Sequence, residues 1–184
     1  EILPGGTLAH VIDHIPDTTA PLPVSHAWHI LLEAVDAQGA TVSVRDTLET
    51  TVAGLIEDGV LDDAVVAKNE REGEMMWRLR DSISEAERAQ GPAIQHDISV
   101  PVELMPDFLV DDTAAVAAQF PGVSMMGFGH LGDGNIHLHA QPPRGEADRG
   151  AAWLADHGDA VSEAIYRRVI AAGGSISAEH GIGR

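Results

Sequence analysis

The chain has 184 residues, of which 44% are hydrophobic, enough to bury the core of one domain or slightly more. Its 11 Lys and Arg residues against 29 Asp and Glu residues give a formal net charge of −18, which repels nucleic acid and anionic membrane surfaces and argues against a nucleic-acid-binding role. The absence of cysteine excludes disulfides and thiolate metal sites, so any metal must be bound by His, Asp or Glu.

The sequence carries no signal for a membrane or a secretory route. No apolar run approaches the roughly 20 residues that span a bilayer, and no signal-peptide pattern occurs at the start. We therefore expect a soluble, cytoplasmic protein. The chain begins with Glu1 and stops at Arg184, directly after a glycine-rich "EHGIG", so we expect it to be a fragment.

The first third of the chain is predicted to mix helices and strands. Residues 1–25 form a leading segment with a short helical pattern, "LAHVIDHI", followed by three prolines. The apolar run 27–37 predicts a buried strand, because it is short and bounded by "QG". An amphipathic pattern predicts a helix over 45–59, and the run 60–69 predicts another strand.

The middle of the chain gives the clearest periodicities. Residues 70–91 are charged, free of proline and apolar at helical spacing, which predicts one long helix. The alternating run 93–101 predicts a strand that leads into a proline-started helix over 102–120. Two further strand patterns, 125–131 and 135–141, are separated by Gly and Asp.

After a polar loop, a helix is predicted over 151–172, and "GGSISAEHGIG" (173–183) supplies one more strand. Helices interleaved with strands, two of them joined by a hairpin, predict an α+β fold: a largely antiparallel sheet with helices packed on one face. We expect residues 26–184 to form this domain.

The stretch "GFGHLGDGNIHLH" carries three histidines and four glycines in thirteen residues. Its Asp-Gly pair at 133–134 between two strand patterns predicts a hairpin with a type I′ turn. This register would place His130 directly opposite His137, where two imidazoles can converge on one metal ion. His139 would share their face, opposite Phe128.

The alternative for these histidines is a hydrogen-bonded, solvated sheet face, which is the more common role of any single histidine. A catalytic metal usually takes three protein ligands, and Glu179 in "SAEHGIG" is the best third candidate. Alternation would turn Glu179 and His180 to opposite faces unless the strand bends at the glycines that follow.

Together these motifs resemble a known family. "GHLGDGNIHLH" followed by "SISAEHGIG", with "MWRLRDSISEA" and "HDISVPVELMPDFL" before them in the same order, resembles the C-terminal, substrate-binding half of FAD-linked 2-hydroxy-acid dehydrogenases of the vanillyl-alcohol-oxidase type. That group includes D-lactate dehydrogenase, D-2-hydroxyglutarate dehydrogenase and the flavin subunit of glycolate oxidase. The resemblance runs from about residue 26 to the end and implies a ferredoxin-like cap domain.

The resemblance also implies a reaction. A D-2-hydroxy acid would transfer its α-hydrogen as hydride to FAD and its hydroxyl proton to a base, leaving a 2-oxo acid. A divalent metal, typically zinc, would polarise the hydroxyl. Matched position by position, His130, His137 and Glu179 correspond to the metal ligands and His180 to the general base.

Further residues match substrate and cofactor contacts of that family. Arg80 corresponds to an arginine that binds the substrate carboxylate, for which a planar guanidinium is well suited. Ser84, one helical turn later, Gln95 and His139 correspond to other substrate contacts, and Asn135 either caps the turn or contacts substrate or flavin. Without the resemblance, Arg80 would be taken for a solvated helix charge.

Two positions depart from the family pattern. Relatives commonly carry Lys where this chain has Gln95, and some carry Asn where it has His139. Neutral Gln cannot balance a second carboxylate, so a dicarboxylate substrate such as 2-hydroxyglutarate is less securely implied. The sequence does not identify the particular acid.

The family's flavin-binding domain has no counterpart in this sequence, and its C-terminal continuation is also missing. We therefore expect a cap domain that binds FAD only together with the flavin-binding domain of the same full-length protein and is inert in isolation. The alternative is a non-catalytic module that binds a metal or a small acid. The electron acceptor and a homodimeric assembly are left open.

Overall fold

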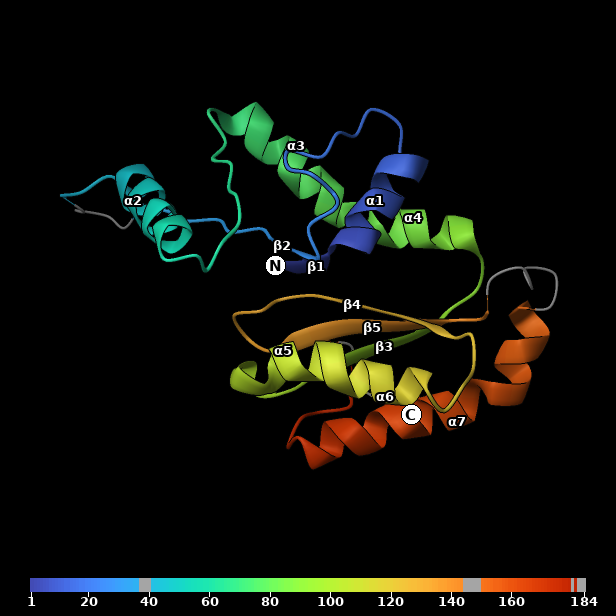
Figure 1. Cartoon of the computed structure of the whole chain (residues 1–184). Coiled ribbons are helices and arrows are strands. Elements are labelled where there is room, and N and C mark those ends of the chain that lie inside the picture. The colour runs from blue at the N-terminus through green and yellow to red at the C-terminus, as the bar shows by residue number, and fades with distance from the viewer. Residues whose placement is uncertain (37–40, 144–149, 180, 182–184) are drawn as a thin grey trace.

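The computed structural model describes residues 1–36, 41–143, 150–179 and 181 (Figure 1). Its centre is an antiparallel sheet in the order β3 (Ile94–Ser99), β5 (Asn135–Gln141), β4 (Ser124–Phe128). Helices flank this sheet, so the predicted α+β class is confirmed. The strand predictions for 93–101, 125–131 and 135–141 are also confirmed within one to three residues at their ends.

A two-stranded sheet extends the central one. β1 (Ile2–Pro4) pairs antiparallel with β2 (Trp28–Ile30), and a bridge in which Ile2 N donates to Gly129 O at 2.9 Å joins β1 to the chain just after β4. The predicted buried strand 27–37 is therefore wrong: only three of its residues pair, and Ile30 is 55% exposed. No layer of the described structure covers β2, so its apolar side chains stay at the surface.

Strand alternation divides β5 into two chemically different faces. Ile136, Leu138 and Ala140 point into a hydrophobic core that includes Ile98 of β3. The core is closed by helices below the sheet in Figure 1: the run from η1 (Val102–Leu104) to α6 (Thr113–Ala117), and the long α7 (Gly150–Ala171). The opposite face of β5 carries its polar residues, which are Asn135, His137, His139 and Gln141.

The predicted helix 102–120 is helical but not uniform. After η1 come α5 (Met105–Asp107), the π-helical turn η2 (Phe108–Asp112) and α6 (Thr113–Ala117). The predicted helix 151–172 is confirmed as α7. Together they bury Met105, Val116, Val161 and Ile165 against the sheet.

A second hydrophobic cluster lies above the sheet in Figure 1, where α1 (Gly5–His14) packs beside α3 (Glu70–Asp81) and α4 (Ile83–Gln90). The prediction of helix over 70–91 is confirmed, with a break at Ser82. Phe128 at the end of β4 belongs to this cluster. The polar face of β5 and helices α3 and α4 therefore lie across from one another.

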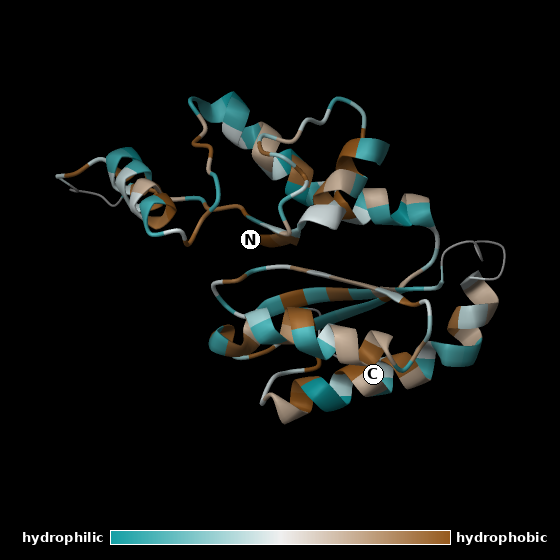
Figure 2. Cartoon of the chain, viewed as in Figure 1, coloured by the Kyte–Doolittle hydropathy of each residue, from teal (hydrophilic) through white to brown (hydrophobic). Residues whose placement is uncertain are grey.

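The remaining segments contribute little to either core. α2 (Val44–Glu57) confirms the predicted helix but buries no side chain, and the predicted strand 60–69 is wrong because those residues form no strand. Figure 2 shows hydrophobic stretches along the extended segments beside α2, where Val35 and Val60 are 85% and 67% exposed. No described helix is both long and apolar enough to cross a membrane.

Candidate functional site

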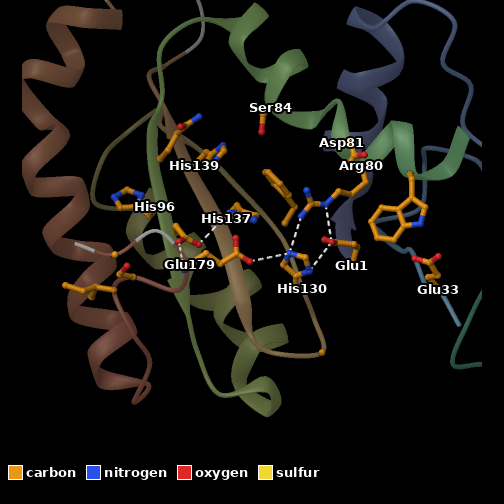
Figure 3. Close-up of a pocket in the computed structure, with 18 of the residues that line it drawn as sticks. Glu1, Glu33, Arg80, Asp81, Ser84, His96, His130, His137, His139 and Glu179 are labelled. Atoms are coloured by element: carbon orange, nitrogen blue, oxygen red, sulfur yellow. Dashed lines mark hydrogen bonds and ion pairs between the residues drawn. The ribbon is translucent and has the colours of Figure 1, made fainter. Parts of the chain in front are cut away.

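A cavity of about 1350 Å³ lies against the polar face of the sheet. Most of the predicted site residues line it: Arg80, Ser84, Gln95, His130, His137, His139 and Glu179 (Figure 3). Asn135 does not line it, and His180 lies outside the described residues. The structure therefore brings together seven side chains from four separate segments of the sequence.

The hairpin that carries the histidines differs from its predicted register by two residues. Phe128, not His130, lies opposite His137, and Met126 lies opposite His139. The cause is Gly129, which pairs with Ile2 of β1 and takes the chain away from β5.

The turn that follows is consequently longer than a type I′ turn. The amides of Asp133 and Gly134 both donate to the His130 carbonyl, and of these two residues only Gly134 has positive φ, at 75°. Because a two-residue shift preserves strand alternation, His130 still approaches His137, with 6.2 Å between their ring centroids.

Glu1 links Arg80 to His130. Its Oε1 lies 3.1 Å from Arg80 Nε and 3.1 Å from His130 Nδ1, and its side chain is only 3% exposed. Arg80 also approaches the face of Phe128, with its guanidinium carbon 6.0 Å from the ring centroid. One buried carboxylate thus orients both a cation and an imidazole at the cavity wall.

Glu179 is placed by a short run of pairing along the edge of β3. Ser175 exchanges two backbone hydrogen bonds with Ser99, and Ala178 N donates to the Asp97 carbonyl at 3.0 Å. The Glu179 amide donates to Asp97 Oδ2 at 2.7 Å, and its carboxylate lies 3.6 Å from His130 Nε2. Within the described part of 173–183, the predicted strand is reduced to this bridge.

His137 is paired with Asp97, which lies opposite it on β3, at 3.8 Å between Nδ1 and Oδ1. Burial is the main cause that lowers the pKa of His137 below 6.5, and the positive charge of Arg80 adds to it. The carboxylates of Asp97 and Glu179 act in the opposite direction. The neutral imidazole, the form that binds metals, is favoured.

The predicted ligands have the chemistry of a metal site but not its closed geometry. Within the described ranges, no three His, Asp or Glu side chains converge closely enough to hold an ion. Both histidines are nevertheless backed by a carboxylate at Nδ1, His130 by Glu1 and His137 by Asp97. This outer-shell arrangement is typical of histidines that bind a metal through Nε2.

The other end of the polar face is built around His139. Its Nδ1 lies 2.5 Å from Glu87 Oε2, and the two side chains are 7% and 3% exposed. Gln95 lies directly opposite His139 on β3, and Ser84 precedes Glu87 by three residues on α4. Asn135, by contrast, is buried and donates to Asp97 Oδ1 at 3.0 Å.

Sequence analysis missed three carboxylates of this site: Glu1, Glu87 and Asp97. Asp97 could have been suspected from its place in "HDISVP", two residues beyond Gln95 and on the same strand face. Glu87 shares the helix face of Ser84, which is a weaker signal. Nothing in the local sequence indicates Glu1, because its role depends on the pairing of β1 with the end of β4.

A cavity with one partly buried arginine, several imidazoles and several carboxylates is suited to binding a small organic acid. The family described as "FAD linked oxidases, C-terminal domain" matches residues 1–184. The chain therefore belongs to that family.

Its curated relatives are similar over nearly the whole chain. A D-2-hydroxyglutarate dehydrogenase of Xanthomonas citri pv. viticola is 32% identical over 179 residues, 96% of this chain and 35% of the relative. The mitochondrial D-2-hydroxyglutarate dehydrogenase of Arabidopsis thaliana is 29% identical, with 100% and 30% covered. A putative mitochondrial D-lactate dehydrogenase of Schizosaccharomyces pombe is 29% identical, with 94% and 33% covered. The chain spans about a third of their length.

Proposed function

We propose that this chain is the substrate-binding domain of an enzyme that oxidises a D-2-hydroxy acid to a 2-oxo acid, with FAD as hydride acceptor. The observation that carries the proposal is the shared cavity: Arg80, the two histidines and Glu179 lie around one space large enough for a small acid. The names of the relatives support the substrate class.

Arg80 is proposed to bind the substrate carboxylate. Its Nε lies 3.1 Å from Glu1 Oε1, so the terminal Nη atoms would pair with the substrate. Its side chain is only 19% exposed, and partial burial strengthens such a pair relative to one in water. The substrate would thereby be held with its α-carbon near His130 and His137.

His130, His137 and Glu179 are proposed to hold a divalent metal, and two imidazoles with one carboxylate suit zinc. Such an ion would lower the pKa of the substrate hydroxyl. The carboxylates beside both Nδ1 atoms support this role, because each histidine could then bind the metal through its Nε2. Asp97 would position two of the proposed metal ligands, His137 through its Nδ1 and Glu179 through its backbone amide.

His180 stays a proposal as the general base, since it directly follows Glu179. Asn135 stays a proposed flavin-side contact, while Ser84, Gln95 and His139 are proposed to contact the rest of the substrate.

FAD would be bound mainly by another domain of the full-length protein, and hydride transfer would need that domain. The isolated chain is accordingly proposed to be inert. Cytoplasmic location and homodimerisation stay predictions, and the electron acceptor is open.

The test of the function is flavin reduction in the full-length protein. Anaerobic mixing with a panel of D-2-hydroxy acids should bleach the oxidised flavin absorbance, and the L-enantiomers should not. Free FAD mixed with the isolated chain and the same D-2-hydroxy acids should stay oxidised. Binding of these acids without bleaching would instead indicate a non-catalytic module.

The metal proposal has a separate readout. Elemental analysis of the full-length protein should find about one divalent ion per chain, lost in His130→Ala and His137→Ala. His157→Ala, on α7, is the matched control and should keep its metal. Unchanged metal content in both site variants would refute the shared site.

A further inference from the structure

Glu87 is a buried carboxylate directly behind the cavity wall. It lies on α4, and its Oε2 accepts from His139 Nδ1 at 2.5 Å. Its other oxygen, Oε1, is buried and finds no hydrogen-bond partner in the described parts of the chain. His139 lines the cavity, whereas Glu87 does not, so Glu87 can act on a ligand only through His139 and through its charge.

This pair gives its end of the cavity no net positive charge. If His139 is neutral, the pair carries the negative charge of Glu87; if His139 is protonated, the two charges cancel. Gln95, directly across the strand pair, is neutral, and so is the Ser84 hydroxyl. The result is a wall that offers hydrogen bonds without a compensating cation.

Charge elsewhere on the cavity wall points the same way. Arg80 is the one Lys or Arg among the described lining residues, and Glu1 already pairs with it. Acidic side chains on the same wall are Glu1, Glu33, Asp81, Asp97 and Glu179. A substrate with one carboxylate can pair with the Nη atoms of Arg80, whereas a second carboxylate would be desolvated beside His139 without a cation near it.

We infer that Glu87, acting through His139, makes this cavity select a 2-hydroxy acid whose far end is uncharged and hydrogen-bonding over one that ends in a second carboxylate. The inference rests on the proposed function and specifies its substrate class. Glu87 is thus a positioning residue: it fixes the His139 ring through Nδ1, leaving Nε2 for the substrate's tail. Ser84 and Gln95, which line the same cavity, add a hydroxyl and an amide.

The sharpest test compares two substrates that differ only at the far end. D-2-hydroxyglutarate and its 5-carboxamide have the same length and shape, but only the first carries a second carboxylate. With the full-length flavoprotein, we expect kcat/KM to favour the amide by about tenfold, the effect of one unbalanced ionic contact of roughly 1.4 kcal/mol.

Two variants should abolish this preference. Glu87→Gln removes the negative charge and keeps a hydrogen-bonding side chain, and Gln95→Lys adds a cation opposite His139. Each should lower KM for the dicarboxylate about tenfold relative to KM for the amide, which brings the two substrates to similar kcat/KM. Glu85→Gln, an exposed position on the same helix, is the matched control and should change neither substrate. A purely structural role of Glu87 would raise KM for both substrates alike.

Binding measurements keep the inference separate from the catalytic proposal. Calorimetric Kd values for 2-oxoglutarate and its 5-carboxamide should show the same preference and the same loss of it in Gln95→Lys, even if Glu87→Gln folds poorly. If no hydroxy acid reduces the flavin, the proposed function fails while these Kd values still decide the inference. A wild-type protein that favours the dicarboxylate in both assays would overturn it.

Discussion

A single oxygen of Glu1 holds both the Arg80 guanidinium and the His130 imidazole, each at 3.1 Å. The second oxygen of that carboxylate is buried and has no hydrogen-bond partner within the described structure. An ion pair in such a buried setting is stronger than one in water. Glu1 therefore orients two of the groups on which substrate binding is proposed to depend.

Glu1→Gln should weaken substrate binding in the full-length enzyme. The amide can still accept a hydrogen bond but cannot balance Arg80, so we expect KM for the preferred hydroxy acid to rise about tenfold. Steady-state kinetics and the Kd of the 2-oxo acid would measure the effect. Glu33→Gln is the control, because Glu33 lines the same cavity but is exposed. Equal KM values for the two variants would contradict the orienting role.

At the scale of elements, the histidine hairpin shows which structural features the local sequence predicts and which it does not. The Asp-Gly pair correctly indicates a turn between two strands, and alternation correctly places His137 and His139 on one face. The register is wrong because β1, some 130 residues earlier in the chain, competes for Gly129. Turn propensity cannot include such a long-range partner.

Two of the strand predictions failed for a related reason. Runs 27–37 and 60–69 have strand-like apolar composition, but a strand is stabilised by its neighbours rather than by its own residues. β2 has only β1 to pair with, and residues 60–69 pair with no strand in the described structure. Helices 70–91 and 151–172 were predicted well because their hydrogen bonds are local.

The histidine hairpin also contains a matched pair of glycines for an experiment. Gly134 has φ of 75°, and a Cβ added there would lie 2.0 Å from the Val100 carbonyl oxygen; a Cβ on Gly132 would meet nothing within 4 Å. We expect Gly134→Ala to lower the free energy of unfolding by about 2 kcal/mol or more. Gly132→Ala should change it by less than about 0.5 kcal/mol. Urea titration of the two variants would compare them, and similar midpoints would contradict the turn geometry.

At the scale of the whole molecule, the central sheet separates a hydrophobic core from a polar site. His96 lines the cavity but is only 3% exposed: its ring bonds the Leu138 carbonyl at 3.1 Å and the Ser162 hydroxyl of α7 at 2.9 Å. Its ring also meets Tyr166 edge-on at 5.3 Å. His96 therefore ties α7 to the sheet that supports the site.

Burial is the main cause that lowers the pKa of His96 below 6.5, and the nearby His139 adds to it; the hydrogen bond to Leu138 acts in the opposite direction. Between the folded-state pKa and 6.5, the unfolded chain binds more protons than the folded chain, so the free energy of unfolding must fall as pH drops. The contribution is fully present above 6.5 and is lost towards the lower, folded-state pKa. His29 and His137 shift in the same direction and add to the effect.

We therefore expect the chain to be less stable at pH 5.5 than at pH 7.5 in urea titrations followed by circular dichroism. His96→Gln should reduce this difference, because it removes one of the three described histidines whose pKa is lowered while keeping hydrogen-bonding capacity. Ser162→Ala is the comparison. It removes the hydrogen bond between Ser162 and His96 and should lower stability at both pH values, but it leaves the His96 imidazole and hence most of the pH dependence. An equal pH dependence in His96→Gln and wild type would show that His96 is not the buried neutral histidine that joins α7 to the sheet.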